Sequence, residues 1–153
     1  MNIENIIAAL KALDLFNDKN ESEFKRIIRV LNQYFDGTSI IDEFFILSEF
    51  DVLDNDDYLI VFVIENNNML EISFRTAEAR IDILPLSTIR RMEINESDVQ
   101  KKDGTVTPPI FTVKIFHDVG TGSPVITGVA EEGNEIGKLK KFAEKIRKKV
   151  LSM

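Results

Sequence analysis

The stretch "ILPLSTIRRMEI", residues 83–94, decides how the middle of the chain folds. An apolar run meets Pro85, and apolar residues then resume at Leu86, Ile89 and Met92. Proline has no N–H to donate to a strand ladder, so a strand must end, bend or lie on an edge there. A spacing of three that resolves into a spacing of two indicates a half-turn or bulge before the next strand. We interpret the stretch as a strand that turns a corner in a small open barrel.

Alternating apolar and polar residues on both sides of this stretch predict a series of short strands. The start of the first strand, "SIIDEFF", is also compatible with a short helix capped by Ser39. The connections are too short for crossover helices, so neighbouring strands should be antiparallel. The expected strands are 44–52, 58–65, 69–76, 79–86, 89–95, 110–117 and 125–130.

Three segments instead carry the apolar stripe of an amphipathic helix: 3–16, 21–35 and 134–151. Asn2 can cap the first helix, Asn20 with Glu23 resembles a capping box for the second, and Gly37 is a natural stop. The predicted class is therefore α+β. A helical hairpin, residues 1–37, precedes a seven-stranded antiparallel open barrel closed by a C-terminal helix, residues 38–153.

This pattern resembles the pleckstrin-homology-like superfold, in particular its small bacterial-type members, over residues 40–151. The resemblance rests on the number of strands, the junction 83–94 and the closing helix 134–151. It implies binding of phospholipid head groups, peptides or protein surfaces, and not catalysis. Members that hold phosphoinositides use basic residues on the first two strands, but residues 51–62 contain four acids and no base. Like charge therefore disfavours that lipid site.

The chain of 153 residues has a net charge of −7 and no cysteine, which excludes disulfides, thiolate metal sites and cysteine nucleophiles. The acidic N-terminus lacks the basic start of a secretory signal, and the longest apolar run, 58–64, is too short for a spanning helix. We therefore expect a cytoplasmic protein.

No set of side chains in the sequence has a catalytic arrangement. His117 is the only histidine, and neither a paired carboxylate nor a nucleophile elbow accompanies it. An EF-hand loop that started at Asp54 would have Leu59 where glycine is required. We expect no enzymatic activity, no metal and no cofactor.

The charges are divided unevenly along the chain, and this division provides the candidate binding residues. No lysine or arginine occurs between Arg29 and Arg75, a segment that includes the acidic turn residues Asp54, Asp56 and Asp57. The C-terminal helix is rich in bases. Those expected on its exposed face are Lys138, Lys141, Lys145, Lys148 and Lys149. Solvation alone is the competing explanation, because cations suit the C-terminal end of a helix.

These features predict a non-enzymatic binding or adaptor module that recognises another protein, with self-association as one form of that recognition. One alternative is binding to an anionic membrane through the basic helix, which the net charge disfavours. Another is an acidic inhibitor of the antitoxin or immunity type. Nucleic acid is not expected, because the only aromatic residue among the bases, Phe142, belongs to the apolar stripe.

Overall fold

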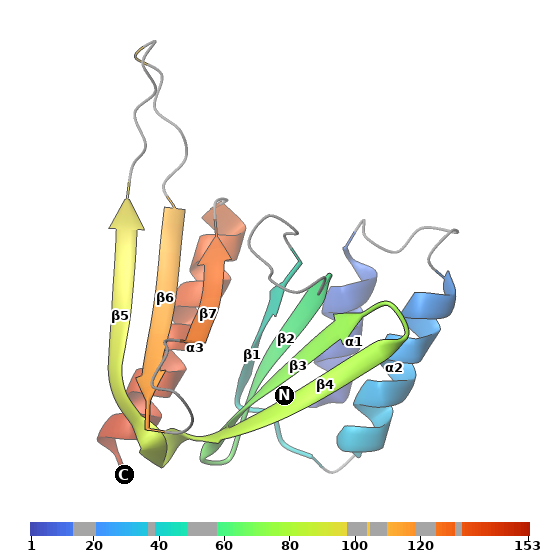
Figure 1. Ribbon diagram of the computed structural model, residues 1–153, viewed down its shortest axis with the longest axis horizontal. Helices are drawn as coiled ribbons and strands as arrows, with labels where there is room; N and C mark the ends of the chain where they lie inside the picture. Colours follow the sequence, from blue (N-terminus) through green and yellow to red (C-terminus); the bar gives the residue numbers. More distant parts are fainter. Residues whose placement is uncertain are drawn as a thin grey trace. The chain divides into compact units, whose positions relative to one another are not determined.

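The computed structural model (Figure 1) describes residues 1–13, 21–36, 39–48, 58–97, 104, 110–118, 125–130 and 133–153. The contacts of the chain divide it into two compact units, Met1–Ile83 and Leu84–Met153. The boundary falls inside the stretch 83–94. The first unit contains α1 (Ile3–Lys11), α2 (Glu21–Tyr34), β1 (Glu43–Leu47), β2 (Leu59–Glu65), β3 (Asn68–Arg75) and β4 (Glu78–Pro85, whose last two residues enter the second unit). The second contains the 3₁₀ turn η3 (Leu86–Thr88), β5 (Ile89–Ser97), β6 (Ile110–His117), β7 (Val125–Ala130) and α3 (Gly133–Leu151).

The two N-terminal helices form as their apolar spacing predicts. The Asn2 side chain accepts a hydrogen bond from the Glu4 N–H, and the Asn5 side chain accepts one from the Asn2 N–H, which completes a capping box. Helix α1 ends at Lys11, earlier than the predicted 3–16, because Leu13 already donates to the Leu10 carbonyl in a tighter turn. The predicted signals at Asn20 and Gly37 lie outside the described residues.

A four-stranded antiparallel sheet in the order β1-β2-β3-β4 receives both helices on one face. Alternate residues of β2 and β3 point to this face and join the helices in a single hydrophobic core. The buried members of that core are Ile3, Ile6, Ile7, Leu10, Ile27, Leu31, Phe35, Ile41, Leu59, Val61, Val63, Leu70, Ile72 and Phe74. The hairpin 1–37 thus packs against the first sheet, a partner that the sequence did not predict.

The opposite face of the same sheet is also apolar. Phe45 pairs across the sheet with Phe62, and both side chains are buried, as are Ile64 and Met69. Strand β2 is therefore buried on both faces, which explains why its sequence is a continuous apolar run and does not alternate. Among the residues that the structure describes, Ser73 is the one buried polar residue, and its hydroxyl has no hydrogen-bond partner there.

The second unit is a three-stranded antiparallel sheet, in the order β5-β6-β7, with α3 packed on one face. Figure 1 shows α3 behind β6 and β7 in this view. On β6 the buried side chains are Phe111, Val113 and Ile115, at alternate positions. From α3 the buried residues are Ile136, Leu139, Phe142, Ala143 and Ile146. The stripe predicted for the C-terminal helix is therefore confirmed as its buried face.

The stretch 83–94 makes the turn that its spacing predicted. Strand β4 ends at Pro85, one turn of 3₁₀ helix follows, and the Thr88 hydroxyl donates to the Pro85 carbonyl. A bulge then shifts the pairing with β6 between Ile89 and Arg91, so Arg90 is the extra residue. The half-turn and the bulge, which the spacing left as alternatives, are therefore both present.

Seven strands and three helices confirm the α+β class with antiparallel sheets. The strands do not form one continuous sheet: within the described chain they pair as a group of four and a group of three, and no closed barrel results. Pro85 and η3 end the first ladder, so β5 begins a new ladder with β6. The first strand is shorter than predicted, since β1 ends at Leu47 and residues 49–57 lie outside the described chain. The division at residues 37 and 38 stays a prediction.

Candidate functional site

Helix α3 presents its predicted basic residues on the side away from the sheet. Five apolar side chains of the helix are buried, so the helix is held in one orientation and the remaining positions face solvent. Lys138, Lys141 and Lys148 are exposed, whereas Lys145 and Lys149 are partly buried. From Lys138 to Lys148 their spacing of three or four residues places successive lysines next to one another on one side of the helix, and Lys149 follows Lys148 directly. We call these five residues the lysine stripe.

Two members of the stripe form ion pairs with carboxylates of the same helix. Lys138 Nζ lies 3.2 Å from Glu135 Oε1, and Lys148 Nζ lies 3.9 Å from Glu144 Oε1. Glu144 is also bound by both ends of the Arg147 guanidinium, at 2.6 and 2.9 Å. This hydrogen bonding, together with the charges of Arg147 and Lys148, lowers the pKa of Glu144, so the carboxylate stays charged and shared.

Lys141 and Lys145 differ from these two lysines. No ion pair joins either of them to another residue in the described part of the chain. They are four residues apart, one turn of helix, in the middle of the stripe. Lys140 lies off the stripe and is engaged by the sheet, with its Nζ 3.8 Å from Glu96 and 5.3 Å from the Phe111 ring centre. Lys141 and Lys145 are therefore two adjacent members of the stripe without a carboxylate partner among the described residues, while Glu144 cancels only one of the two charges of Arg147 and Lys148.

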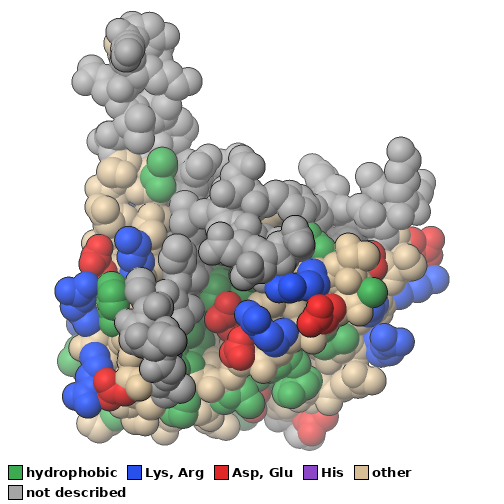
Figure 2. All heavy atoms as spheres, in the orientation of Figure 1, with side chains coloured by type: hydrophobic (Ala, Val, Ile, Leu, Met, Phe, Trp, Pro, Cys, Tyr) green, Lys and Arg blue, Asp and Glu red, His purple; other side chains and the backbone are tan. Residues whose placement is uncertain are grey.

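The face shown in Figure 2 has a different charge pattern. Basic and acidic side chains alternate over the strands there and do not gather by sign. Ion pairs on or beside the strands join Arg80 with Asp82, Arg90 with Asp118, and Arg91 with Glu93. Arg91 also stacks on the Phe116 ring at 4.1 Å. Charges that are already paired within the protein attract a charged ligand only weakly.

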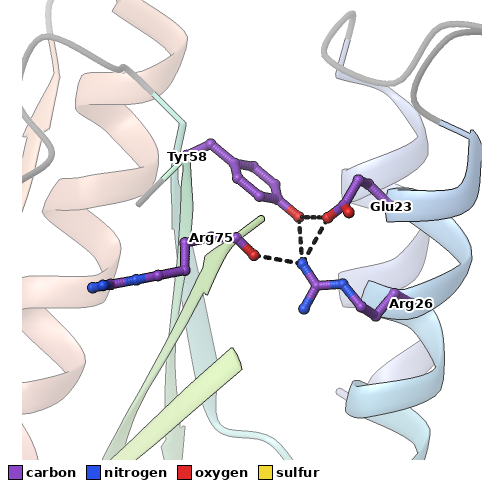
Figure 3. Close-up of polar contacts among 4 residues, drawn as sticks. All are labelled: Glu23, Arg26, Tyr58 and Arg75. Atoms are coloured by element: carbon purple, nitrogen blue, oxygen red, sulfur yellow. Dashed lines mark hydrogen bonds and ion pairs between the residues drawn. The ribbon is translucent and has the colours of Figure 1, made fainter. Parts of the chain in front are cut away.

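A second cluster of polar side chains, not found from the sequence, joins α2 to the first sheet (Figure 3). One terminal nitrogen of Arg26 donates to Glu23 Oε2 at 2.6 Å, to the Tyr58 hydroxyl at 3.1 Å and to the Arg75 carbonyl at 2.6 Å. The Tyr58 hydroxyl in turn donates to Glu23 Oε2 at 2.7 Å. The partners of Arg26 are 3, 32 and 49 residues away, so only the spacing of Glu23 and Arg26 is visible in the sequence.

The contacts in this cluster shift the pKa values of Glu23 and Tyr58 in opposite directions. Hydrogen bonds from Arg26 and then from Tyr58 lower the pKa of Glu23. Burial, followed by the hydrogen bond to Glu23, raises the pKa of Tyr58. The Arg26 side chain is only 16% exposed, and its Nε is buried without a partner among the described groups. All three side chains are occupied by one another, so the cluster fastens the helix to the sheet and leaves no open position for a substrate.

The acidic turn and the histidine lie apart from the lysine stripe in the sequence. Asp54, Asp56 and Asp57 lie outside the described residues. His117 is partly buried at the end of β6, opposite Ile89, and has a partner of its own. In the part of the chain that the structure describes, no three His, Asp or Glu side chains lie close enough together to hold a metal ion. None of the described helices combines the length and apolar composition needed to cross a membrane.

Comparison of the chain with protein-family models, curated proteins and solved structures gave no match. The function must therefore be argued from the lysine stripe and the fold that supports it.

Proposed function

We propose that the protein is a non-enzymatic binding module that recognises an acidic surface of another protein through the lysine stripe of α3. The observation that carries this proposal is the uncompensated pair Lys141 and Lys145 on a helix whose orientation is set by its buried face. Because the buried face sets the direction of the helix, both charges lie on one side of it and can steer a partner of opposite charge.

An anionic membrane is a weaker candidate for the same stripe. A helix that inserts at a lipid surface needs its apolar face for the lipid, and the apolar face of α3 is buried within the protein. Electrostatic attraction alone contributes about 1 kcal/mol for each lysine near the surface. With two uncompensated lysines and a net charge of −7, such attraction is small.

The fold that we propose behind this function is the pleckstrin-homology-like barrel. Two antiparallel sheets of four and three consecutive strands, followed by a helix that packs on β6 and β7, support that architecture. We propose a cytoplasmic location on the same footing, since the chain has no cysteine and its fold needs no disulfide. An experimental structure that arranged the two sheets other than as a bent barrel would overturn the proposed architecture.

The test of the function compares two double variants with the same net charge. Lys141→Glu with Lys145→Glu removes the uncompensated charge, and Lys11→Glu with Lys25→Glu makes the same change on the exposed sides of α1 and α2. Each substitution changes the charge by −2, so both variants go from −7 to −11. The tagged wild-type protein is used to isolate partners from a cell extract, and each captured protein is then purified and titrated.

We expect direct binding whose affinity falls as the salt concentration rises. The α3 variant should bind at least roughly tenfold more weakly than wild type, and the control variant should bind with the wild-type affinity. Binding that both variants lose equally would reflect net charge and would contradict the proposal. Sedimentation of the wild-type protein with phosphatidylserine vesicles, with no purified protein bound, would show a membrane function instead. Binding that survives in the α3 variant and is lost on neutralising Asp54, Asp56 and Asp57 would support the inhibitor alternative.

A further inference from the structure

Strand β5 has one neighbour in its sheet, β6, and its second edge is unpaired among the described strands. The strand is nine residues long, and after the bulge at Arg90 its pairing with β6 is regular from Arg91 to Ser97. A regular, unpaired edge presents a row of backbone N–H and C=O groups that can extend the sheet with another strand. Natural sheets usually shorten, bend or cover such an edge.

Two apolar side chains of β5 also remain partly exposed to water. Ile94 lies opposite Val113 on the face that α3 covers, yet Ile94 is 49% exposed while Val113 is fully buried. Met92, on the same face and opposite the buried Ile115, is partly exposed. The apolar side chains of this strand therefore lose only part of their contact with water, and a strand added at the edge would remove more of it.

We propose that β5 pairs antiparallel with β5 of a second copy of this chain, about a two-fold axis at Ile94. This register opposes Ile94 to Ile94, Glu93 to Asn95, Met92 to Glu96, and Arg91 to Ser97. It uses all seven residues from Arg91 to Ser97 and joins the two three-stranded sheets into one of six strands. A two-fold contact of this kind is closed, because each copy uses the same surface once.

Charge, apolar contact and the bulge together favour this register over its neighbours. An axis at Asn95 would oppose Ile94 to Glu96 and so lose the apolar contact at the centre. An axis at Glu93 would set two carboxylates directly opposite each other, which destabilises a strand pair. An axis at Met92 would run into the bulge at Arg90 after a single residue on each side. With the axis at Ile94, no two like charges are directly opposite, and the isoleucines meet at the centre. Glu93 and Glu96 at the edge then act against pairing in other registers.

Single cysteines test the contact, since the chain has none of its own. Ile94→Cys places two thiols across the axis, where the Cα atoms of opposed residues in antiparallel strands are about 4.5–5.5 Å apart, within reach of a disulfide. Ile83→Cys is the matched control. Ile83 is 58% exposed on β4, which is also an edge strand. Under mild oxidation we expect a reducible covalent dimer from Ile94→Cys, formed at least about tenfold faster than from Ile83→Cys.

Sedimentation of the wild-type protein measures the same association without a cross-link. We expect a species of twice 17.5 kDa at high concentration, lost in Ile94→Lys, which sets two ammonium groups at the axis, and kept in Ile83→Lys. A mass of 17.5 kDa at every concentration, or equal cross-linking of the two cysteine variants, would overturn the proposal. The lysine stripe is unchanged in all four variants, so partner binding can fail or succeed separately.

Discussion

At the scale of single residues, Arg26 is the most consequential polar group that the structure describes. Its guanidinium is mostly removed from water, which is costly unless its hydrogen bonds are replaced. One nitrogen finds three oxygens, on α2, on Tyr58 at the start of β2 and on Arg75 at the end of β3. These bonds fix the position of α2 on the first sheet, because all three can form in only one position of the helix.

Replacing Arg26 with methionine should therefore lower the free energy of unfolding by about 1–3 kcal/mol. Methionine keeps much of the apolar stem but removes the Arg26 donor from the Arg75 carbonyl and from the Glu23 carboxylate, which keeps only the Tyr58 hydroxyl of this cluster. Urea denaturation measures the change. Lys25→Met is the control, since Lys25 and its partner Glu21 are 74% and 68% exposed, and it should stay within about 0.5 kcal/mol of wild type. Equal losses in the two variants would contradict a special role for Arg26.

The same cluster should make stability depend on pH at both ends of the scale. Glu23 has a folded-state pKa below its ordinary 4.5, so its contribution is complete above 4.5 and is lost as the pH falls through the folded-state pKa. Tyr58 has a pKa raised above its ordinary 10.0, so its contribution is complete below 10.0 and is lost as the pH rises beyond it.

Glu23→Gln should isolate the acidic half of this dependence. Urea unfolding between about pH 6 and about pH 3 should show a smaller loss of stability in the variant than in wild type, because one carboxylate with a lowered pKa is gone. Glu21→Gln, which removes an exposed carboxylate from the same helix, is the matched control. A wild-type slope in Glu23→Gln would show that Glu23 is not held by Arg26 and Tyr58 in solution.

At the scale of secondary structure, α3 shows how one helix serves two purposes. Its apolar stripe is buried on β6 and β7, and this burial fixes the direction of the lysine stripe. The ion pairs on its surface are exposed and contribute little to stability. Stability and recognition are therefore carried by different residues of the same helix, and they can be changed separately.

Truncating Phe142 should show the stabilising half of this division. The ring is fully buried, so Phe142→Ala should cost about 3–5 kcal/mol of unfolding free energy. Leu151→Ala, at a position 71% exposed near the end of the same helix, should cost less than about 0.5 kcal/mol. Chemical denaturation compares the two. A small loss for Phe142→Ala would mean that α3 is not packed as the structure describes.

At the scale of the whole molecule, the two proposals reinforce each other. The proposed two-fold axis is perpendicular to the joined sheet, because each copy keeps Ile94 on the same face. The α3 helices of the two copies would then lie on one side of the six-stranded sheet, and both lysine stripes would be available to one multivalent partner. Two linked weak sites bind such a partner more tightly than either does alone.

This arrangement predicts a loss of avidity without a loss of intrinsic affinity. Ile94→Lys should bind a densely immobilised partner at least roughly tenfold more weakly than wild type, and should bind the same partner free in solution with unchanged affinity. Surface plasmon resonance at high and low partner density makes the comparison, with Ile83→Lys as the control. If Ile94→Lys bound the densely immobilised partner as tightly as wild type does, the prediction would be wrong, and self-association would not contribute to partner binding.

The sequence by itself determined the elements and much of their order. The apolar spacing located three helices and seven strands, and the short connections required antiparallel neighbours, because these signals depend on residues close along the chain. Proline and the change of spacing in the stretch 83–94 identified the corner and the bulge. The buried stripe of α3 and the lysines opposite it were equally visible, since a helix turns its faces at a known angle.

Only the tertiary structure decided how these elements pair and which charges remain. The strands separate into sheets of four and three, the hairpin packs on the first sheet, and Arg26 finds oxygens 32 and 49 residues away. Intrahelical carboxylates form ion pairs with Lys138 and Lys148 but not with Lys141 and Lys145. Such outcomes depend on contacts between distant residues and on side-chain conformations, and neither can be predicted from the spacing of residue types along the sequence.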